Sequence, residues 1–236
     1  HDADLLGLQE LIGQDDLAEI LGPASPYGAV AYPLGPWTYA DAALLYRRSR
    51  FELLDQGQLW LSPHPDRPFS AGWKRLSVPR YAAWAHLRQR ADGFELLFVN
   101  AHFDNNGPNK DGAAALFGEV FGPIAAALPL VVTGDFNTHR HADRYPTLLA
   151  GGALANTADR AQVVGLAGDA DPEDRYFDPD KLVDHVLVGG EATVFTWTQE
   201  SPRLGDEGRR PSDHPVIVVE MELGRRLTTM SRLSYR

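Results

Sequence analysis

The stretch Leu130-Val131-Val132-Thr133-Gly134-Asp135-Phe136-Asn137 joins a short apolar run to a polar turn. An apolar run of this length, bounded by proline and glycine, is typical of a buried β-strand. Because side chains alternate along a strand, Asp135 and Asn137 are expected to lie on the same side of the sheet's end. An aspartate there can orient or deprotonate a water molecule, and an asparagine can hold a phosphate oxygen. Both residues also favour turns, so this stretch alone leaves a plain turn open.

Similar short apolar runs recur along the whole chain and predict further strands. They lie at residues 5–8, 29–32, 43–46, 81–87, 94–99, 183–188, 192–198 and 216–220. Helical patterns are fewer. They lie at residues 15–21 and 111–128, with a third starting at 145, and Pro123 is expected to kink or end the second. Polar segments at residues 62–79, 168–180 and 199–211 are predicted to be loops.

The organisation of the chain is simple. The sequence contains no internal repeat and no composition shift that would mark a linker. We therefore expect one mixed α/β domain, with two sheets and outer helices, over residues 1–224. A basic tail is expected over residues 225–236. We expect the protein to be a monomer.

Composition narrows the functional classes. The net charge is −10, from 32 acidic and 22 basic residues, which argues against a protein that coats nucleic acid. It does not exclude a nuclease, because a carboxylate metal site itself adds negative charge. The absence of cysteine excludes a disulfide scaffold, a thiolate zinc site and a cysteine nucleophile. It leaves the compartment open between the cytoplasm and secretion. No apolar run is long enough to cross a bilayer.

Two further strand ends carry polar residues that suit phosphate chemistry. Asn100-Ala101-His102-Phe103-Asp104 follows the run at 94–99 and places His102 and Asp104 on one face. Gln9-Glu10 follows the run at 5–8, and a carboxylate at a strand end suits a Mg²⁺ ion. A structural histidine and an ordinary surface acid are the alternatives at these two positions.

A single acid, Asp184, interrupts the apolar run Leu182-Val183-Asp184-His185-Val186-Leu187-Val188. A buried aspartate is costly unless it is paired. His214, in Ser212-Asp213-His214-Pro215 just before the last predicted strand, is the candidate partner, because a carboxylate would fix its tautomer and favour the imidazolium. His185 is expected to point to the opposite face and to be structural.

The order of these motifs resembles that of the endonuclease/exonuclease/phosphatase superfamily. The order is Gln-Glu, His-x-Asp, Gly-Asp-x-Asn, an aspartate within an apolar strand, and Ser-Asp-His. That superfamily includes DNase I-like nucleases, abasic-site endonucleases, deadenylases, inositol-polyphosphate phosphatases and neutral sphingomyelinases. The resemblance covers nearly the whole chain, from Asp2 to about Glu222. It implies an α/β fold, a four-layer α/β/β/α sandwich, with the active site where strand ends of the two sheets converge.

The resemblance also implies roles for individual residues. It implies that Glu10 is a metal ligand and that Asp213 lies beside the metal. It implies that Asp135 orients or deprotonates water with help from Asn137. The implied phosphate contacts are Asp184, His214 and His102. Arg80 matches a basic residue that DNase I-like members place near the phosphate. The implied metal is Mg²⁺ or Mn²⁺. Trp73 lies in the loop at 62–79, which could close over a compact substrate, so Trp73 is expected to contact that substrate.

The chain departs from the family pattern at its start. Members normally begin with a strand that carries an asparagine and helps to bind metal, and here the sequence starts just before the Gln-Glu strand. We therefore expect an unpaired sheet edge beside residues 5–9 and one metal-site residue fewer. The segments Trp60-Leu61-Ser62 and His102-Phe103-Asp104-Asn105-Asn106-Gly107 also resemble an uncharacterised bacterial subgroup, which implies no single substrate.

The leading hypothesis is a divalent-metal-dependent phosphoesterase that hydrolyses a phosphodiester or phosphomonoester by in-line attack of water. Its substrate could be a nucleic acid, a small molecule or a lipid head group. Arg203, Arg209 and Arg210 precede Ser212-Asp213-His214 and would suit a nuclease. The negative charge and the lack of an aromatic–basic stacking platform argue against one. The alternative is a catalytically impaired binding module that retains the sandwich.

Overall fold

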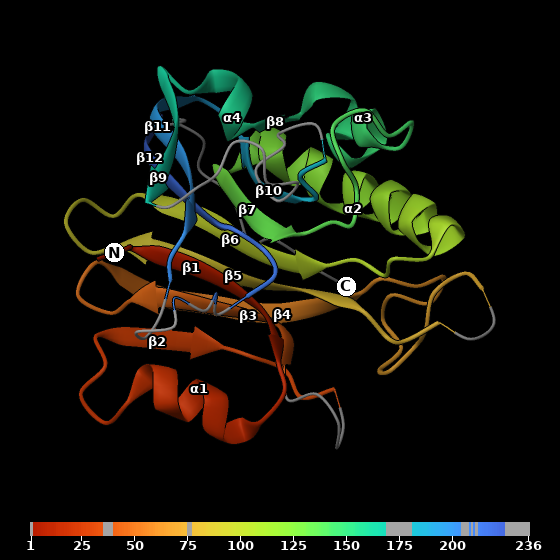
Figure 1. The fold of residues 1–236 in the computed structure, drawn as a ribbon, viewed down its shortest axis with the longest axis horizontal. Coiled ribbons are helices and arrows are strands. Elements are labelled where there is room, and N and C mark those ends of the chain that lie inside the picture. The colour runs from red at the N-terminus through yellow and green to blue at the C-terminus, as the bar shows by residue number, and fades with distance from the viewer. Residues whose placement is uncertain are drawn as a thin grey trace.

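The computed structural model describes residues 2–34, 40–74, 77–168, 181–203, 208, 210 and 212–224 (Figure 1). Its elements are, in chain order, β1 (Leu5–Leu11), α1 (Gln14–Leu21), β2 (Tyr27–Val30), β3 (Ala40–Arg47), β4 (Phe51–Trp60), β5 (Tyr81–Gln89), β6 (Glu95–His102), α2 (Gly107–Ala127), β7 (Leu130–Asp135), α3 (Tyr145–Leu148), the 3₁₀ turn η1 (Ala150–Gly152), β8 (Leu154–Asn156), α4 (Thr157–Arg160), β9 (Val163–Gly168), β10 (Asp184–Gly189), β11 (Ala192–Ser201) and β12 (Val216–Leu223). In this part of the chain, no helix is both long and apolar enough to cross a membrane.

The strands form two stacked layers between helices. A six-stranded sheet in the order β4-β5-β6-β7-β10-β8 lies at the centre, and α2 and α3 cover one of its faces (Figure 1). The three-stranded sheet β1-β3-β2 lies on the other face, and α1 covers its outer side (Figure 1). A second three-stranded sheet, β12-β11-β9, contributes Met221 and Leu223 to the apolar contacts between the layers. The predicted four-layer α/β/β/α sandwich is confirmed.

Apolar runs in the sequence arise where a strand is buried on both faces, as β6 and β3 illustrate. In β6, Leu97 packs into the core under α2 while Phe98 packs into the core between the sheets. In β3, Leu44 belongs to the core between the sheets and Leu45 to the core under α1. Since consecutive side chains of a strand point to opposite faces, both positions must be apolar, and the period-2 alternation disappears.

Strand β1 lies at the edge of its sheet. Among the described residues it pairs with β3 alone. The expected unpaired edge beside residues 5–9 is therefore present in this part of the chain.

The sequence patterns missed several elements. The missed elements are β4, β8, β9 and α4. In β4 the polar residues Asp55, Gln56 and Gln58 break the apolar pattern, and the pairing with β5 shifts register between Leu53 and Asp55. The described residues of the segment at 62–79 contain no strand, as predicted. Most of the segment at 168–180 and the whole tail at 225–236 lie outside the described residues.

The second helix was predicted to kink or end at Pro123. It does not end there, because α2 continues through Pro123 to Ala127. A proline removes the hydrogen bond to the carbonyl four residues earlier, here that of Glu119. Both residues lie on the exposed face of α2, where water can satisfy that carbonyl. The helix also begins earlier than predicted, at Gly107, with Pro108 in its first turn, where the fixed φ of proline suits a helix start.

The two layers approach each other closely at Gly7 of β1. A Cβ atom at this position would lie 2.0 Å from Thr133 Oγ1 and 2.5 Å from Asn100 Oδ1, both in the central sheet. We predict that Gly7→Ala lowers the free energy of unfolding by about 2 kcal/mol or more, because the sheets must separate or the polar side chains must move. Denaturant unfolding measures this.

Gly165→Ala is the matched control, because a Cβ atom at Gly165 in β9 would meet nothing within 4 Å. It should leave the free energy of unfolding within about 0.5 kcal/mol of the unsubstituted protein. Equal stability of the two variants would contradict the close packing at Gly7.

Candidate active site

Three predicted site residues stand side by side at one end of the central sheet. His102 ends β6 and is in register with Asp135 at the end of β7. Asp135 is in turn opposite Asp184, the first residue of β10. The distance between His102 Nε2 and Asp135 Oδ2 is 3.5 Å. The ends of three neighbouring strands thus form a row of one imidazole and two carboxylates.

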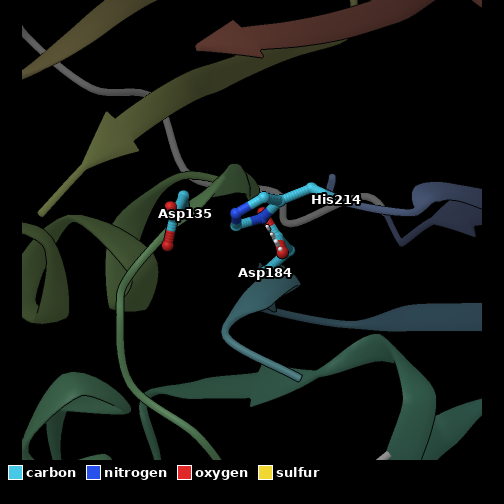
Figure 2. A group of neighbouring side chains, drawn as sticks. All are labelled: Asp135, Asp184 and His214. Carbon is cyan, nitrogen blue, oxygen red and sulfur yellow. Dashed lines mark hydrogen bonds and ion pairs between the residues drawn. The ribbon is translucent and has the colours of Figure 1, made fainter. Parts of the chain in front are cut away.

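His214 reaches this row from the loop before β12. Its Nδ1 lies 2.7 Å from Asp184 Oδ2, and Figure 2 shows its ring between the two aspartates. The backbone N–H of His214 donates to Ser212 Oγ, which fixes the turn that carries the ring. The hydrogen bond and the negative charge of Asp184 raise the pKa of His214 to about 9. His214 is therefore an imidazolium at neutral pH.

Asp135 is buried, with 7% of its surface exposed. Burial, together with the charge of Asp184, raises the pKa of the Asp135 carboxyl. The facing charge of His102 and a hydrogen bond from the Asn137 backbone N–H, 2.7 Å from Asp135 Oδ1, act in the opposite direction. Two carboxylates placed directly opposite each other repel, so this pair favours either a proton or a cation between them.

A divalent cation fits the donors at this point. Asp135, Asp184 and His214 each offer one ligand atom, and these atoms lie within 4.8 Å of one another. Carboxylate oxygens are the ligands that Mg²⁺ and Mn²⁺ prefer. A ring nitrogen must lose its proton to ligate, whereas His214 Nδ1 is already engaged by Asp184 Oδ2. The donors therefore favour a cation on the carboxylate side of this group, with His214 donating rather than ligating.

The turn that follows β7 is held rigidly. Asn137 has a left-handed backbone, with φ of 46°, and its side-chain N–H donates to the carbonyl oxygen of Phe103 at 2.9 Å. Buried His185 has its Nε2 2.7 Å from the Thr138 carbonyl oxygen, and Phe136 stacks on its ring. Burial lowers the pKa of His185, so its ring is neutral and Nε2–H donates to that carbonyl. His185 lies on the face of β10 away from His214 and supports the turn.

The sequence patterns missed one buried acid of the site, Asp41 in β3. Arg80 Nη1 lies 2.6 Å from both carboxylate oxygens of Asp41, and His102 Nδ1 lies 3.0 Å from Asp41 Oδ1. Burial alone would raise the pKa of Asp41, but the hydrogen bond and charge of His102 and the charge of Arg80 lower it below its ordinary value. Asp41 is therefore ionised and orients His102 across the two sheets. In the sequence, Asp41 shows the same pattern as Asp184, since each is a single acidic residue within an apolar run.

Arg80 and His102 share more than this acid. Arg80 Nη1 is also 2.8 Å from His102 Nδ1, and Arg80 Nε is buried without a hydrogen-bond partner in the described part of the chain. On the same ring, Nδ1 lies 3.0 Å from Asp41 Oδ1 and Nε2 lies 3.5 Å from Asp135 Oδ2. Arg80 thus adds positive charge next to the row of His102, Asp135 and Asp184.

Three of the predicted site residues are exposed. Glu10 is exposed and has a left-handed backbone, with φ of 59°. Asp213 is exposed beside His214, and its charge adds to the rise of the His214 pKa. Trp73 is 37% exposed and lies over α2, where a Cβ atom at Gly112 would be 2.2 Å from its indole ring. No hydrogen bond or ion pair within the described ranges joins Glu10, Asp213 or Trp73 to Asp135 or Asp184.

The sequence profile of the Endonuclease/Exonuclease/phosphatase family matches residues 1–214 of the chain. The chain belongs to this family. No curated protein matches the sequence.

Several solved structures share the fold over most of their length. A mannosyl-6-phosphatase from Bacteroides thetaiotaomicron is 29% identical, with 94% of this chain and 86% of that one covered and a TM-score of 0.77. A family member from the same organism is 28% identical, covers 94% and 82%, and has a TM-score of 0.77. One from Bacteroides vulgatus is 26% identical, covers 95% and 86%, and has a TM-score of 0.79. The first of these acts on a phosphoester, and the family is one of phosphoester hydrolases.

The ion pair of Asp184 and His214 makes stability depend on pH. Folded His214 has a raised pKa of about 9, whereas an unperturbed histidine has 6.5. The contribution of the pair is therefore complete below about pH 6.5 and is lost as the pH rises through about 9. Because 39% of the His214 side chain is exposed, we expect this contribution to be only on the order of 1 kcal/mol.

We predict that the metal-free protein loses about 1 kcal/mol more stability than its His214→Gln variant between about pH 6 and pH 9.5. Urea unfolding of both proteins across this range measures the difference, and effects of other titrating groups cancel. Parallel stability curves for the two proteins would show that His214 is not held as an imidazolium.

Proposed function

We propose that the protein is a divalent-metal-dependent phosphoesterase that uses water as the nucleophile and acts on a compact phosphorylated substrate of the sugar phosphate class. The observation that supports this best is the pair of facing carboxylates, Asp135 and Asp184, beside an imidazolium at His214. Such a group combines a place for a cation, an acceptor for the proton of water and a donor to a phosphate oxygen.

The cation would be Mg²⁺ or Mn²⁺, bound beside Asp184 with Glu10 and Asp213 as proposed carboxylate ligands, so that Asp135 stays available to the attacking water. When bound, it would offset negative charge on the phosphate and the leaving oxygen. The repulsion between the two aspartates then becomes a source of binding energy, since a cation relieves it.

The side chains of the chain divide the remaining chemistry. Asp135 aligns the attacking water and takes its proton, while the hydrogen bond from the Asn137 backbone holds the carboxylate in place. His214, charged and oriented by Asp184, donates to a phosphate oxygen. Arg80, oriented by Asp41, supplies positive charge for the negative charge that develops on the phosphoryl oxygens, and His102, held by the same acid, places its Nε2 beside Asp135.

Three observations favour a compact substrate over a nucleic acid. The chain is strongly acidic, at −10, so a polyanion would be repelled away from the site. The relative at 29% identity is a mannosyl-6-phosphatase. The half-exposed indole of Trp73 is fixed over α2 because the side chain of Asn109 accepts from the backbone N–H of Lys74, and an indole face can pack on a sugar ring.

Activity profiling tests the proposal directly. The protein, stripped with a chelator and given Mg²⁺ or Mn²⁺, is offered sugar phosphates, bis-nitrophenyl phosphate, phospholipid head groups, DNA and RNA. We predict metal-dependent release of phosphate from sugar phosphates, and a loss of kcat by a factor of about 100 or more in Asp135→Asn and His214→Gln. Trp73→Ala should raise KM for sugar phosphates, because it removes only binding.

Matched controls separate chemistry from stability. Asp55→Asn and His86→Gln make the same chemical changes at an exposed position of β4 and at the ion pair of His86 with Glu95. Both should retain activity. Undiminished turnover without a cation, or full activity of both site variants, would overturn the mechanism. Binding of phosphorylated ligands with no turnover of any of them would instead favour the catalytically impaired binding module.

A further inference from the structure

One buried side chain ties the two sheet layers together. Asn100 of β6 has no exposed surface and uses both ends of its amide. Its N–H groups donate to the carbonyl oxygens of Leu8 and Ala43 at 2.8 and 2.9 Å, both in the β1-β3-β2 sheet. Its oxygen accepts from Gln9 Nε2 at 2.6 Å and from Thr133 Oγ1 at 2.9 Å. The amide is therefore fully satisfied, with three of its four hydrogen bonds crossing between the layers.

Each of these bonds lies close to a residue of the active site. Asn100 is two residues before His102 on β6, and Thr133 is two residues before Asp135 on β7. Since side chains alternate along a strand, each pair shares a face. On the other sheet, Gln9 directly precedes Glu10. Ala43 stands two residues from Asp41 on β3.

The apolar contacts between the sheets cannot define this alignment alone. Hydrophobic burial has no preferred direction, so it defines the relative position of two apolar faces less sharply than hydrogen bonds do. Hydrogen bonds fix distances and angles, and breaking these would leave buried polar groups unsatisfied. The edge strand β1 pairs only with β3 in the described part of the chain, so its bonds to Asn100 are its polar attachment to the central sheet.

We propose that Asn100 is a positioning residue that fixes the register between the two sheets, so that Asp41 on one sheet faces His102 on the other, next to Asp135. Its effect on catalysis rests on the proposed function, whereas its effect on geometry does not. A purely structural asparagine would change stability when substituted but would leave the alignment of His102 with Asp41 and the turnover number as they are.

The test uses two variants of different severity. Gln9→Met removes one bond between the sheets from a half-buried side chain and preserves its length. Asn100→Asp preserves size but removes both donors to Leu8 and Ala43. If Asn100→Asp does not fold, Gln9→Met still decides the outcome. Thr157→Val is the control, because it removes one buried hydrogen bond, from Thr157 Oγ1 to the Val186 carbonyl oxygen, outside the contact between the sheets.

The first readout is independent of any substrate. Nitrogen-15 NMR of the histidine rings should show shifted His102 signals in Gln9→Met and Asn100→Asp, because the distance from His102 to Asp41 changes. The signals of His86, whose ring pairs with Glu95, serve as an internal reference and should remain in place. Thr157→Val should leave His102 unshifted.

The second readout is turnover of a substrate that the unsubstituted protein hydrolyses. We expect kcat to fall roughly 10- to 100-fold in the two variants with KM nearly unchanged, since a misplacement of about 1 Å costs that much. Unshifted His102 signals, or a kcat within about twofold of the unsubstituted protein in both variants, would overturn the proposal. An inactive unsubstituted protein would instead contradict the proposed function, and the NMR result would still decide the role of Asn100.

Discussion

The polar contact around Asn100 is the constraint on which the active site depends, because the site draws its residues from two sheets. Asp41 comes from one sheet, and His102, Asp135 and Asp184 come from the other. A site divided in this way works only if the sheets keep one alignment to within a fraction of an ångström. A buried amide with four partners provides that alignment, and Gly7 provides the room for it. The same contact explains why so polar a cluster is tolerated between two apolar layers, since every member is satisfied.

Electrostatics then decides what this framework can do. Asp135 and Asp184 face each other across neighbouring strands, an arrangement that costs free energy in the absence of a counter-charge. His214 offsets part of that cost from one side, and the guanidinium of Arg80, next to His102, supplies positive charge from the other. Charged groups at this end of the sheet make the folded protein less stable than apolar residues at the same positions would. This loss is what one expects of a site that binds a cation and a phosphate.

The sequence predicted much of this arrangement, and the failures have physical causes. The doubly buried strands β6, β7 and β10 could be found because both faces demand apolar residues, and the polar residues at their ends stand out. Strand β4 was missed because polar residues and a register shift interrupt its pattern. Asp41 was missed because the strand around it was counted from Ala43. The contacts of Asn100 could not be predicted, since Leu8 and Gln9 lie 92 and 91 residues away in the chain, and only the stacking of the sheets brings them together.

The most direct test of the proposed mechanism is to measure which product receives the oxygen atom of water. In the proposed mechanism, water attacks phosphorus at a centre that requires a divalent cation. Hydrolysis of a sugar phosphate in water enriched in heavy oxygen, with the protein first stripped of metal and then given Mg²⁺, should place one heavy oxygen in each phosphate released and none in the sugar. Label in the sugar, or release of labelled phosphate at the same rate without any cation, would contradict it.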